Sequence, residues 1–133
     1  MYPVEHVIKE CFYNKGTVEG IVLGLKEHPS EWARKTLQKL IERCPLSLKV
    51  AFRAFNVGLR QSFREVLEME FCLNMSMMLH YRYNFINGVR AKLRKKKFVD
   101  WVPAFLEEVS EEMVNEMFGN RDGLRLNLSF LDF

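Results

Sequence analysis

The stretch that decides the fold runs from Cys44 to Phe98 and reads CPLSLKVAFRAFNVGLRQSFREVLEMEFCLNMSMMLHYRYNFINGVRAKLRKKKF. Proline is well accommodated in the first turn of a helix, where the amide that it lacks would have no acceptor. We therefore expect a helix to begin at Pro45 or Leu46, and Gly58 to weaken its far end. Apolar residues at spacings of three and four predict its buried stripe, which comprises Leu48, Ala51, Phe52, Phe55 and Leu59.

A capping box begins the second helix of this stretch. The hydroxyl of Ser62 can accept the amide of Glu65, and the carboxylate of Glu65 can reach back to the amide of Ser62. No proline or glycine interrupts the chain from there to Tyr81, a length of about five turns. We expect Asn84 to cap a third helix, and the apolar face of that helix to comprise Phe85, Val89 and Leu93.

The flanking segments also carry helix caps. The predicted helices cover residues 18–26, 31–43 and 111–118, and their caps are Thr17, Ser30 and Ser110. The spacing of Gly20 and Gly24 is interpreted as incidental. We expect five or six helices before Lys97, and then an irregular segment over residues 99–105, because Pro103 restricts the residue before it to extended geometry.

The predicted fold class is all-α. A helical domain is expected over residues 1–118 and an extended tail over residues 119–133. Apolar and polar residues alternate from Leu124 to Phe130, which is typical of a half-buried strand. A lone strand has nothing in this chain to pair with, so we expect the tail to seek the sheet edge or groove of a partner.

Four motifs make the chain recognisable. They are CPLSLK at residues 44–49, REVLEME at residues 64–70, NFxNGVRAxL at residues 84–93, and the pair Trp101 and Pro103. Together they resemble the C-terminal part of the 3-hydroxyisobutyryl-CoA hydrolases, which belong to the crotonase (enoyl-CoA hydratase) superfamily. The resemblance implies the C-terminal helical region of a crotonase-type fold without its ββα core. Active members of that family usually carry acidic residues where Asn84 and Asn87 stand in this chain.

The sequence offers no catalytic or metal-binding constellation. The resemblance implies that acyl-CoA thioester hydrolysis takes place in the ββα core, where Gly-rich loops form an oxyanion hole. The glycines of this chain are all isolated: Gly16, Gly20, Gly24, Gly58, Gly88, Gly119 and Gly123. His6, His28 and His80 show no ligand spacing, and Cys72 would lie roughly 12 Å along a helix from His80. We therefore assign no catalytic residue, no cofactor and no metal ligand.

The composition indicates a partner protein. Of the 133 residues, 48% are hydrophobic, and they include 11 Phe and 7 Met. We infer more apolar surface than these helices can bury against one another, which favours an obligate partner, expected to be a chain with the crotonase core. No apolar run approaches the roughly 18 residues of a membrane span, so no membrane partner is expected. Three widely spaced cysteines fit reduced thiols better than disulfides.

A basic run is the best functional candidate in the sequence. The candidate RNA or phosphate contacts are Arg90, Lys92, Arg94, Lys95, Lys96 and Lys97, six of the eight residues from Arg90 to Lys97. The run fits either a solvated helix face or a phosphate-binding patch. Phe98 and Trp101 nearby would add aromatic surface for RNA. The resemblance implies that this basic run lies near the nucleotide of CoA.

Two functions from different classes follow. The leading hypothesis is a non-enzymatic structural subunit of a large assembly, a protein of the mitochondrial small ribosomal subunit located in the matrix, because hydrolase-like relatives of the resembled family serve there. The alternative is the C-terminal chain of a split acyl-CoA hydrolase whose catalytic core is a separate polypeptide. A third hypothesis is a helical adaptor that folds alone. Reversible two-state unfolding of the isolated chain would support it and would count against the other two functions.

Overall fold

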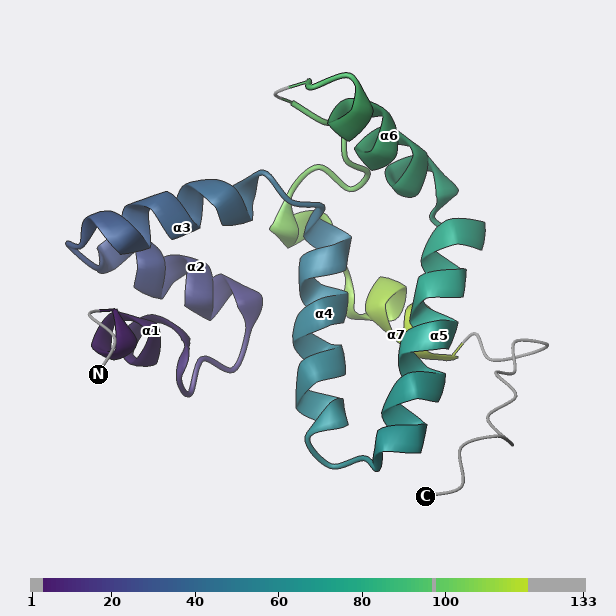
Figure 1. The fold of residues 1–133 in the computed structure, drawn as a ribbon, viewed down its shortest axis with the longest axis horizontal. Coiled ribbons are helices and arrows are strands. Elements are labelled where there is room, and N and C mark those ends of the chain that lie inside the picture. Colours follow the sequence, from purple (N-terminus) through teal and green to yellow (C-terminus); the bar gives the residue numbers. More distant parts are fainter. Residues whose placement is uncertain (1–3, 97, 120–133) are drawn as a thin grey trace.

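The computed structural model describes residues 4–96 and 98–119, which are helical throughout apart from turns and connecting segments (Figure 1). The elements are α1 (Glu5–Phe12), α2 (Val18–Glu27), α3 (Glu31–Ile41), α4 (Pro45–Gly58), α5 (Phe63–Leu79), α6 (Arg82–Leu93), the 3-10 helix η1 (Leu106–Glu108) and α7 (Glu111–Gly119). Within the described residues there is no strand, which confirms the all-α prediction. The predicted strand in the tail lies outside them.

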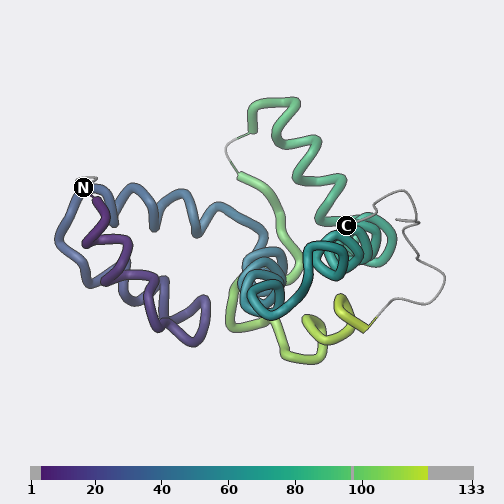
Figure 2. Tube along the Cα trace, turned by 60° about the horizontal axis from the view of Figure 1, so that its bottom comes forward, coloured from purple at the N-terminus to yellow at the C-terminus, as the bar shows by residue number. Residues whose placement is uncertain are grey.

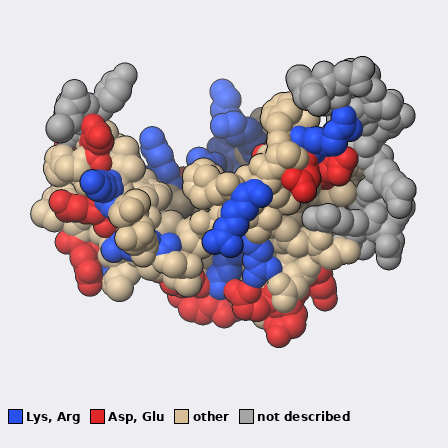
Figure 3. Space-filling model, turned by 90° about the horizontal axis from the view of Figure 1, so that it is seen from below, with Lys and Arg blue, Asp and Glu red and all other residues tan. Residues whose placement is uncertain are grey.

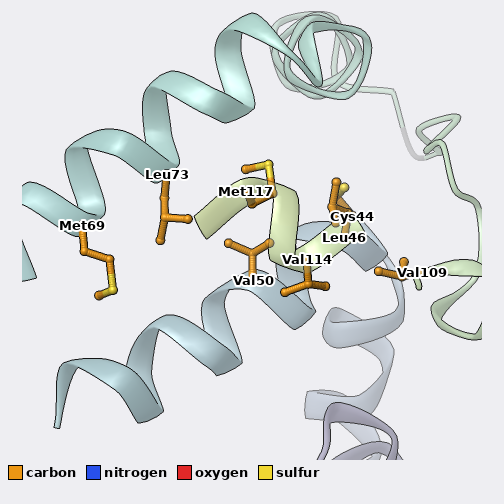
Figure 4. Close-up of a cluster of buried hydrophobic side chains, with 8 residues drawn as sticks. All are labelled: Cys44, Leu46, Val50, Met69, Leu73, Val109, Val114 and Met117. Atoms are coloured by element: carbon orange, nitrogen blue, oxygen red, sulfur yellow. The ribbon is translucent and has the colours of Figure 1, made fainter. Parts of the chain in front are cut away.

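Two hydrophobic clusters hold these helices together. The first lies among α1, α2 and α3 and comprises Val7, Cys11, Ile21, Leu25 and Ala33. The second joins α4, α5 and α7 (Figure 4) and comprises Cys44, Leu46, Val50, Met69, Leu73, Val109, Val114 and Met117. Phe52 of α4 packs against the first cluster. Figure 2 shows α1–α3 on one side of α4, and α6 projecting away from the remaining helices.

The predicted helix starts are confirmed by their cap hydrogen bonds. The hydroxyls of Thr17, Ser30 and Ser110 each accept the backbone amide three residues further on, at 3.1–3.2 Å. The capping box of Ser62 and Glu65 is complete. The side-chain hydrogen bond from Ser62, followed by that from its backbone amide, lowers the pKa of the Glu65 carboxyl. These caps act within one turn of the chain, which is why sequence alone predicts them.

The buried face of α4 differs from the predicted one. Leu46 and Val50 are buried, whereas Phe55 and Leu59 are 69% and 70% exposed. The reason is that α7, which is remote in the sequence, packs against the side of α4 that carries Leu46 and Val50. The predicted stripe is therefore wrong at Ala51, Phe55 and Leu59, which lie on an exposed apolar surface instead.

The predictions for α6 also need correction. The helix begins at Arg82, after Tyr81 at the cap position, so Asn84 lies inside the helix and is buried rather than capping it. The predicted apolar face is the solvent-exposed face, with Phe85 at 44%, Val89 at 42% and Leu93 at 78% exposure. The opposite face, which carries Asn84, is the one that packs against the rest of the chain.

Gly24 permits a close approach of α1 to α2, and Gly20 takes no part in that approach. A Cβ atom at Gly24 would lie 3.2 Å from the carbonyl oxygen of Cys11, which is tighter than ordinary packing. The thiol of Cys11 in turn donates to the carbonyl of Gly24 at 3.6 Å. At Gly20 the nearest atom would be the hydroxyl oxygen of Thr17 at 3.4 Å. Of the two glycines, Gly24 is therefore the one that the packing requires.

Substitutions at the two glycines should differ in sign. Gly20→Ala is expected to stabilise the chain by about 0.5–1 kcal/mol, because alanine is the better helix former. Gly24→Leu is expected to destabilise it by about 1–3 kcal/mol, because the side chain would press on the backbone of α1. Urea unfolding followed by circular dichroism measures both. The close approach is refuted if Gly24→Leu is as stable as Gly20→Ala.

Lys49 connects three segments of the chain. Its ammonium group lies 2.7 Å from Oε1 of Glu19 on α2, and it donates to the carbonyl of Val109 at 3.0 Å. The Lys49 side chain is only 17% exposed. Partial burial raises the pKa of Glu19, but its hydrogen bonds and the positive charge of Lys49 outweigh burial, so the pKa is lowered. The ion pair therefore links the first helical cluster to α4 and to the segment before α7.

Replacing Lys49 by Met keeps the aliphatic stem and removes the ammonium group. At neutral pH we expect the free energy of unfolding to fall by about 1–3 kcal/mol. The carbonyl of Val109 loses its hydrogen-bond donor, and the carboxylate of Glu19 loses its counter-ion. Since the folded-state pKa of Glu19 is lowered, its contribution is full above the unfolded-state pKa and is lost as the pH falls through the folded-state value. The stability difference from wild type, measured by urea unfolding, should therefore shrink at acid pH. A constant difference would show that the charge pair contributes nothing.

Candidate functional site

Asn84 attaches α6 to the segment that follows it. Its side-chain amide donates to the carbonyl of Val102 at 2.6 Å, and its side-chain oxygen accepts the amide of Val102 at 2.9 Å. Asn84 is only 4% exposed. The side chain thus satisfies both backbone polar groups of one residue, as a neighbouring strand would. Asn87 adds a longer bond of 3.4 Å to the carbonyl of Asp100.

Trp101 completes this attachment. Its indole nitrogen donates to the carbonyl of Glu42 at 3.1 Å, just after α3. Its ring lies against Gly88, where a Cβ atom would come within 3.1 Å of the ring edge. The asparagine motif of α6 and the aromatic–proline pair, which carried much of the family resemblance, are therefore parts of one clasp, defined by Asn84, Gly88, Trp101 and Val102.

The clasp was missed at the sequence level. Asparagine is a frequent helix cap, and that local role was the expected one for Asn84. Its actual partner lies 18 residues further along the chain. The only available signal was the combination of two asparagines with a glycine and a downstream tryptophan. Helical periodicity does not predict that these residues are in contact.

Asn84→Asp should break the clasp. A carboxylate cannot donate to the carbonyl of Val102, so we expect a loss of about 2–3 kcal/mol at neutral pH. Burial raises the pKa of the introduced carboxyl and its protonated form can donate, so the deficit should shrink as the pH falls. Urea unfolding over a pH series measures this.

The matched control is Asn87→Asp. Asn87 is more exposed and its bond is longer, so the change should stay within about 0.5 kcal/mol. Equal losses at Asn84 and Asn87 would contradict the clasp, and so would a deficit at Asn84 that is independent of pH.

The basic run lies at the far end of α6. Its described members, Arg90, Lys92, Arg94, Lys95 and Lys96, are all exposed, and Lys97 lies outside the described residues. Cations at the C-terminal end of a helix interact favourably with its dipole, so the helix itself gains from them. The structure thus brings five of the six candidates together on one exposed helix end.

At the C-terminal end of α6 the chain reverses its direction. Lys95 has a positive φ of 51°. The amide of Lys95 donates to the carbonyl of Lys92 at 3.3 Å, and the amide of Lys96 donates to that of Ala91 at 2.9 Å. This pair of bonds is the Schellman arrangement, with lysine where glycine is usual. Because the chain turns here, the run does not continue along one helical face.

A shallow pocket of about 160 Å³ lies beside this helix end. It is lined by Asn87, Arg90, Ala91, Arg94, Lys96, Phe98, Val99 and Asp100. Three cations and a side-chain amide suit an anion, whereas the carboxylate of Asp100 opposes one. The pocket is compatible with a phosphate group, whether of RNA or of a free nucleotide.

A second pocket, of about 210 Å³, lies where α2, α4 and α7 meet. Its charged groups are already paired. Lys49 binds Glu19, and Arg53 binds Glu111 and donates to Asn115 at 2.6 Å. These pairs fasten the helices, so we assign the pocket a structural role.

The acidic residues that follow the basic run form a solvated edge. Figure 3 shows acidic side chains gathered along the lower edge of the face in view. The acidic residues that follow the basic run and are exposed are Glu107, Glu108, Glu111, Glu112 and Glu116. Two of these carboxylates also have partners in the chain: Glu111 binds Arg53, and Glu108 accepts the amides of Ala104 and Phe105.

No metal site is found among the described residues, since no group of three or more His, Cys, Asp or Glu side chains could hold an ion. Cys11, Cys44 and Cys72 are buried and are not joined by disulfides. Burial, followed by the charge of Glu10, raises the pKa of the Cys11 thiol and disfavours a reactive thiolate. In the described part of the chain, no helix is long and apolar enough to cross a membrane.

A hollowed apolar surface runs between α4 and α5. One hollow of about 380 Å³ is lined by Ser47, Val50, Ala51, Ala54, Glu70, Leu73, Asn74 and Met77. The other, of about 430 Å³, is lined by Ala51, Ala54, Phe55, Gly58, Leu59, Val66, Met69 and Glu70. The two share Ala51, Ala54 and Glu70, so they form one continuous groove, here named the α4–α5 groove.

Comparison with known proteins defines the class. Residues 2–118 match the enoyl-CoA hydratase/isomerase family, and the chain belongs to that family. Its fold superimposes on a carnitinyl-CoA dehydratase from Mycobacterium thermoresistibile with a TM-score of 0.77 and 25% sequence identity, over 92% of this chain and 33% of the dehydratase. The predicted crotonase-type helical region is thereby confirmed.

Similar proteins narrow the relationship. The chain is 37% identical over 123 residues to the mitochondrial 3-hydroxyisobutyryl-CoA hydrolase of Xenopus tropicalis, covering 89% of this chain and 31% of the hydrolase. It is 37% identical over 117 residues to the corresponding Homo sapiens protein, covering 86% of this chain and 30% of that protein. The chain therefore spans about a third of the length of these relatives, and it corresponds to their C-terminal helical part.

Proposed function

We propose that this chain is the helical C-terminal part of a 3-hydroxyisobutyryl-CoA hydrolase-like protein and acts by completing a crotonase core that supplies the catalytic groups. The observation that carries the proposal is that the family match takes in nearly all of the described structure, while the chain spans only about a third of the length of its hydrolase relatives. The helices here bind and position, and the chemistry belongs to the core.

The exposed apolar surface supports this role. Phe55, Leu59 and Leu93 are each more than two-thirds exposed, and the α4–α5 groove is open. A chain that acted alone would bury such residues, whereas a chain that completes a larger fold presents them to the remainder of that fold. The relatives are named as mitochondrial proteins, so we propose a mitochondrial location.

A second candidate function rests on the basic end of α6. Five exposed cations gather on an element that projects away from the other helices. They suit a phosphate backbone, as in a subunit of the mitochondrial small ribosomal subunit that contacts RNA. The resemblance that suggested a ribosomal role concerns relatives other than the hydrolases compared above. We therefore rank it below the hydrolase-like role.

Sedimentation of the full chain, tagged in its own cells, separates the two functions. We expect it in a small complex, or a longer polypeptide, that contains a crotonase core and hydrolyses 3-hydroxyisobutyryl-CoA. The double substitution Lys95→Glu and Lys96→Glu should leave that core association unchanged, because these residues lie outside the groove. A control double substitution, Lys26→Glu and Lys39→Glu, places the same charge change on exposed residues of α2 and α3.

The opposite result would be co-migration with a ribosomal small subunit. Such co-migration, abolished by the changes at Lys95 and Lys96 but not by those at Lys26 and Lys39, would overturn the hydrolase-like role and establish RNA contact. The number of phosphates contacted would then follow from the dependence of binding on salt concentration.

A further inference from the structure

The α4–α5 groove is the side of this helix pair that α7 leaves open. α4 and α5 are joined by a short turn and lie side by side, and α7 packs against both of them. No described residue of α7 lines either hollow of the groove. The helix pair therefore presents an open apolar groove, whose lining includes Val50, Met69 and Leu73 of the hydrophobic cluster shared with α7.

The shape of the groove fits a helix. Along α4 it extends from Ser47 to Leu59, which is roughly 18 Å at the helical rise per residue. Its α4 wall carries the small residues Ala51, Ala54 and Gly58. Small residues let a third helix approach to the usual interaxial distance of about 8–10 Å.

The backbone chemistry argues against an extended occupant. The backbone amides and carbonyls of α4 and α5 are used within the helices, so the groove offers no sheet edge. A strand laid here would leave its own polar groups without partners, whereas a helix satisfies them internally. An amphipathic helix can therefore cover this surface without leaving backbone polar groups unpaired.

The charge of the groove specifies one residue of that helix. Glu70 is the only ionisable residue among the described residues that line the two hollows. Covering its carboxylate without a counter-charge would be costly. The occupant should therefore place a Lys or Arg opposite Glu70, and apolar side chains on either side of it.

We propose that the α4–α5 groove receives a helix of the crotonase core, with a Lys or Arg of that helix paired to Glu70. This inference rests on the proposed function and names the surface through which it operates. The chain spans about a third of its relatives' length, so the remaining part of such a protein must meet it over an apolar surface. The exposed face of α6, with Phe85, Val89 and Leu93, is the rival surface.

Photo-crosslinking in the native cell tests the groove directly. A crosslinking amino acid is placed at Ala51, which lines both hollows and is exposed, and in a control variant at Lys39, which is exposed on α3. We expect Ala51 to crosslink to a helical segment of a crotonase core that contains a Lys or Arg, in the same or another polypeptide. Lys39 should not label that segment.

Charge reversal provides an independent readout. Glu70→Lys should reduce recovery of the core with the tagged chain by at least about tenfold, and Glu68→Lys, an exposed neighbour on α5 that lies outside the groove, should not. Changing the crosslinked Lys or Arg to Glu should restore recovery with Glu70→Lys. Equal effects of Glu70→Lys and Glu68→Lys would overturn the pairing.

The crosslinked partner distinguishes failure of the groove from failure of the function. Labelling of residues 120–133 or of a second copy from Ala51, with a crotonase core recovered through another surface, would overturn the groove and leave the proposed function standing. Recovery of no crotonase core by any variant would overturn both.

Discussion

The ammonium group of Lys49 links parts of the chain that the hydrophobic clusters leave nearly separate. α1–α3 have their own cluster, and Phe52 is the main apolar contact between that cluster and α4. Lys49 adds a directed link, because it binds Glu19 of α2 and the carbonyl of Val109 at once. It fixes where the first three helices lie and where the chain turns toward α7. α4 is therefore central to the fold: α2 meets it through Lys49, α7 meets it through Leu46, Val50 and Arg53, and α5 runs beside it.

The central position of α4 explains which predictions succeeded. Caps depend on atoms within one turn, so Thr17, Ser30 and Ser62 could be assigned from sequence, and with them the starts of α2, α3 and α5. The direction of a buried face depends on what packs there. α4 carries apolar residues around most of its circumference, so periodicity could not choose between Leu46 with Val50 and Phe55 with Leu59. α7 decided the choice, and nothing local to α4 signals it.

Asn84 shows the same limit for a polar residue. A helix cap and a long-range clasp both use the side-chain amide of asparagine, and only the second requires it to donate and accept at the same residue. An aspartate would serve as a cap but not in this clasp. The asparagine motif of this chain therefore has a structural role: Asn84 pairs with Val102, and Gly88 accommodates Trp101. The sequence identified the right residues and assigned one of them the wrong role.

The two candidate surfaces lie on different elements, and this separation bears on function. The α4–α5 groove is apolar with one carboxylate, whereas the end of α6 is cationic and lies beyond the clasp. A protein core seated in the groove would make no demand on Lys95 or Lys96, so the basic end would remain available to an anion. The clasp determines where that basic end lies, because Asn84 and Trp101 tie α6 to the segment after it and to the end of α3. An anion bound by these cations would therefore be positioned relative to the end of α3 by the clasp.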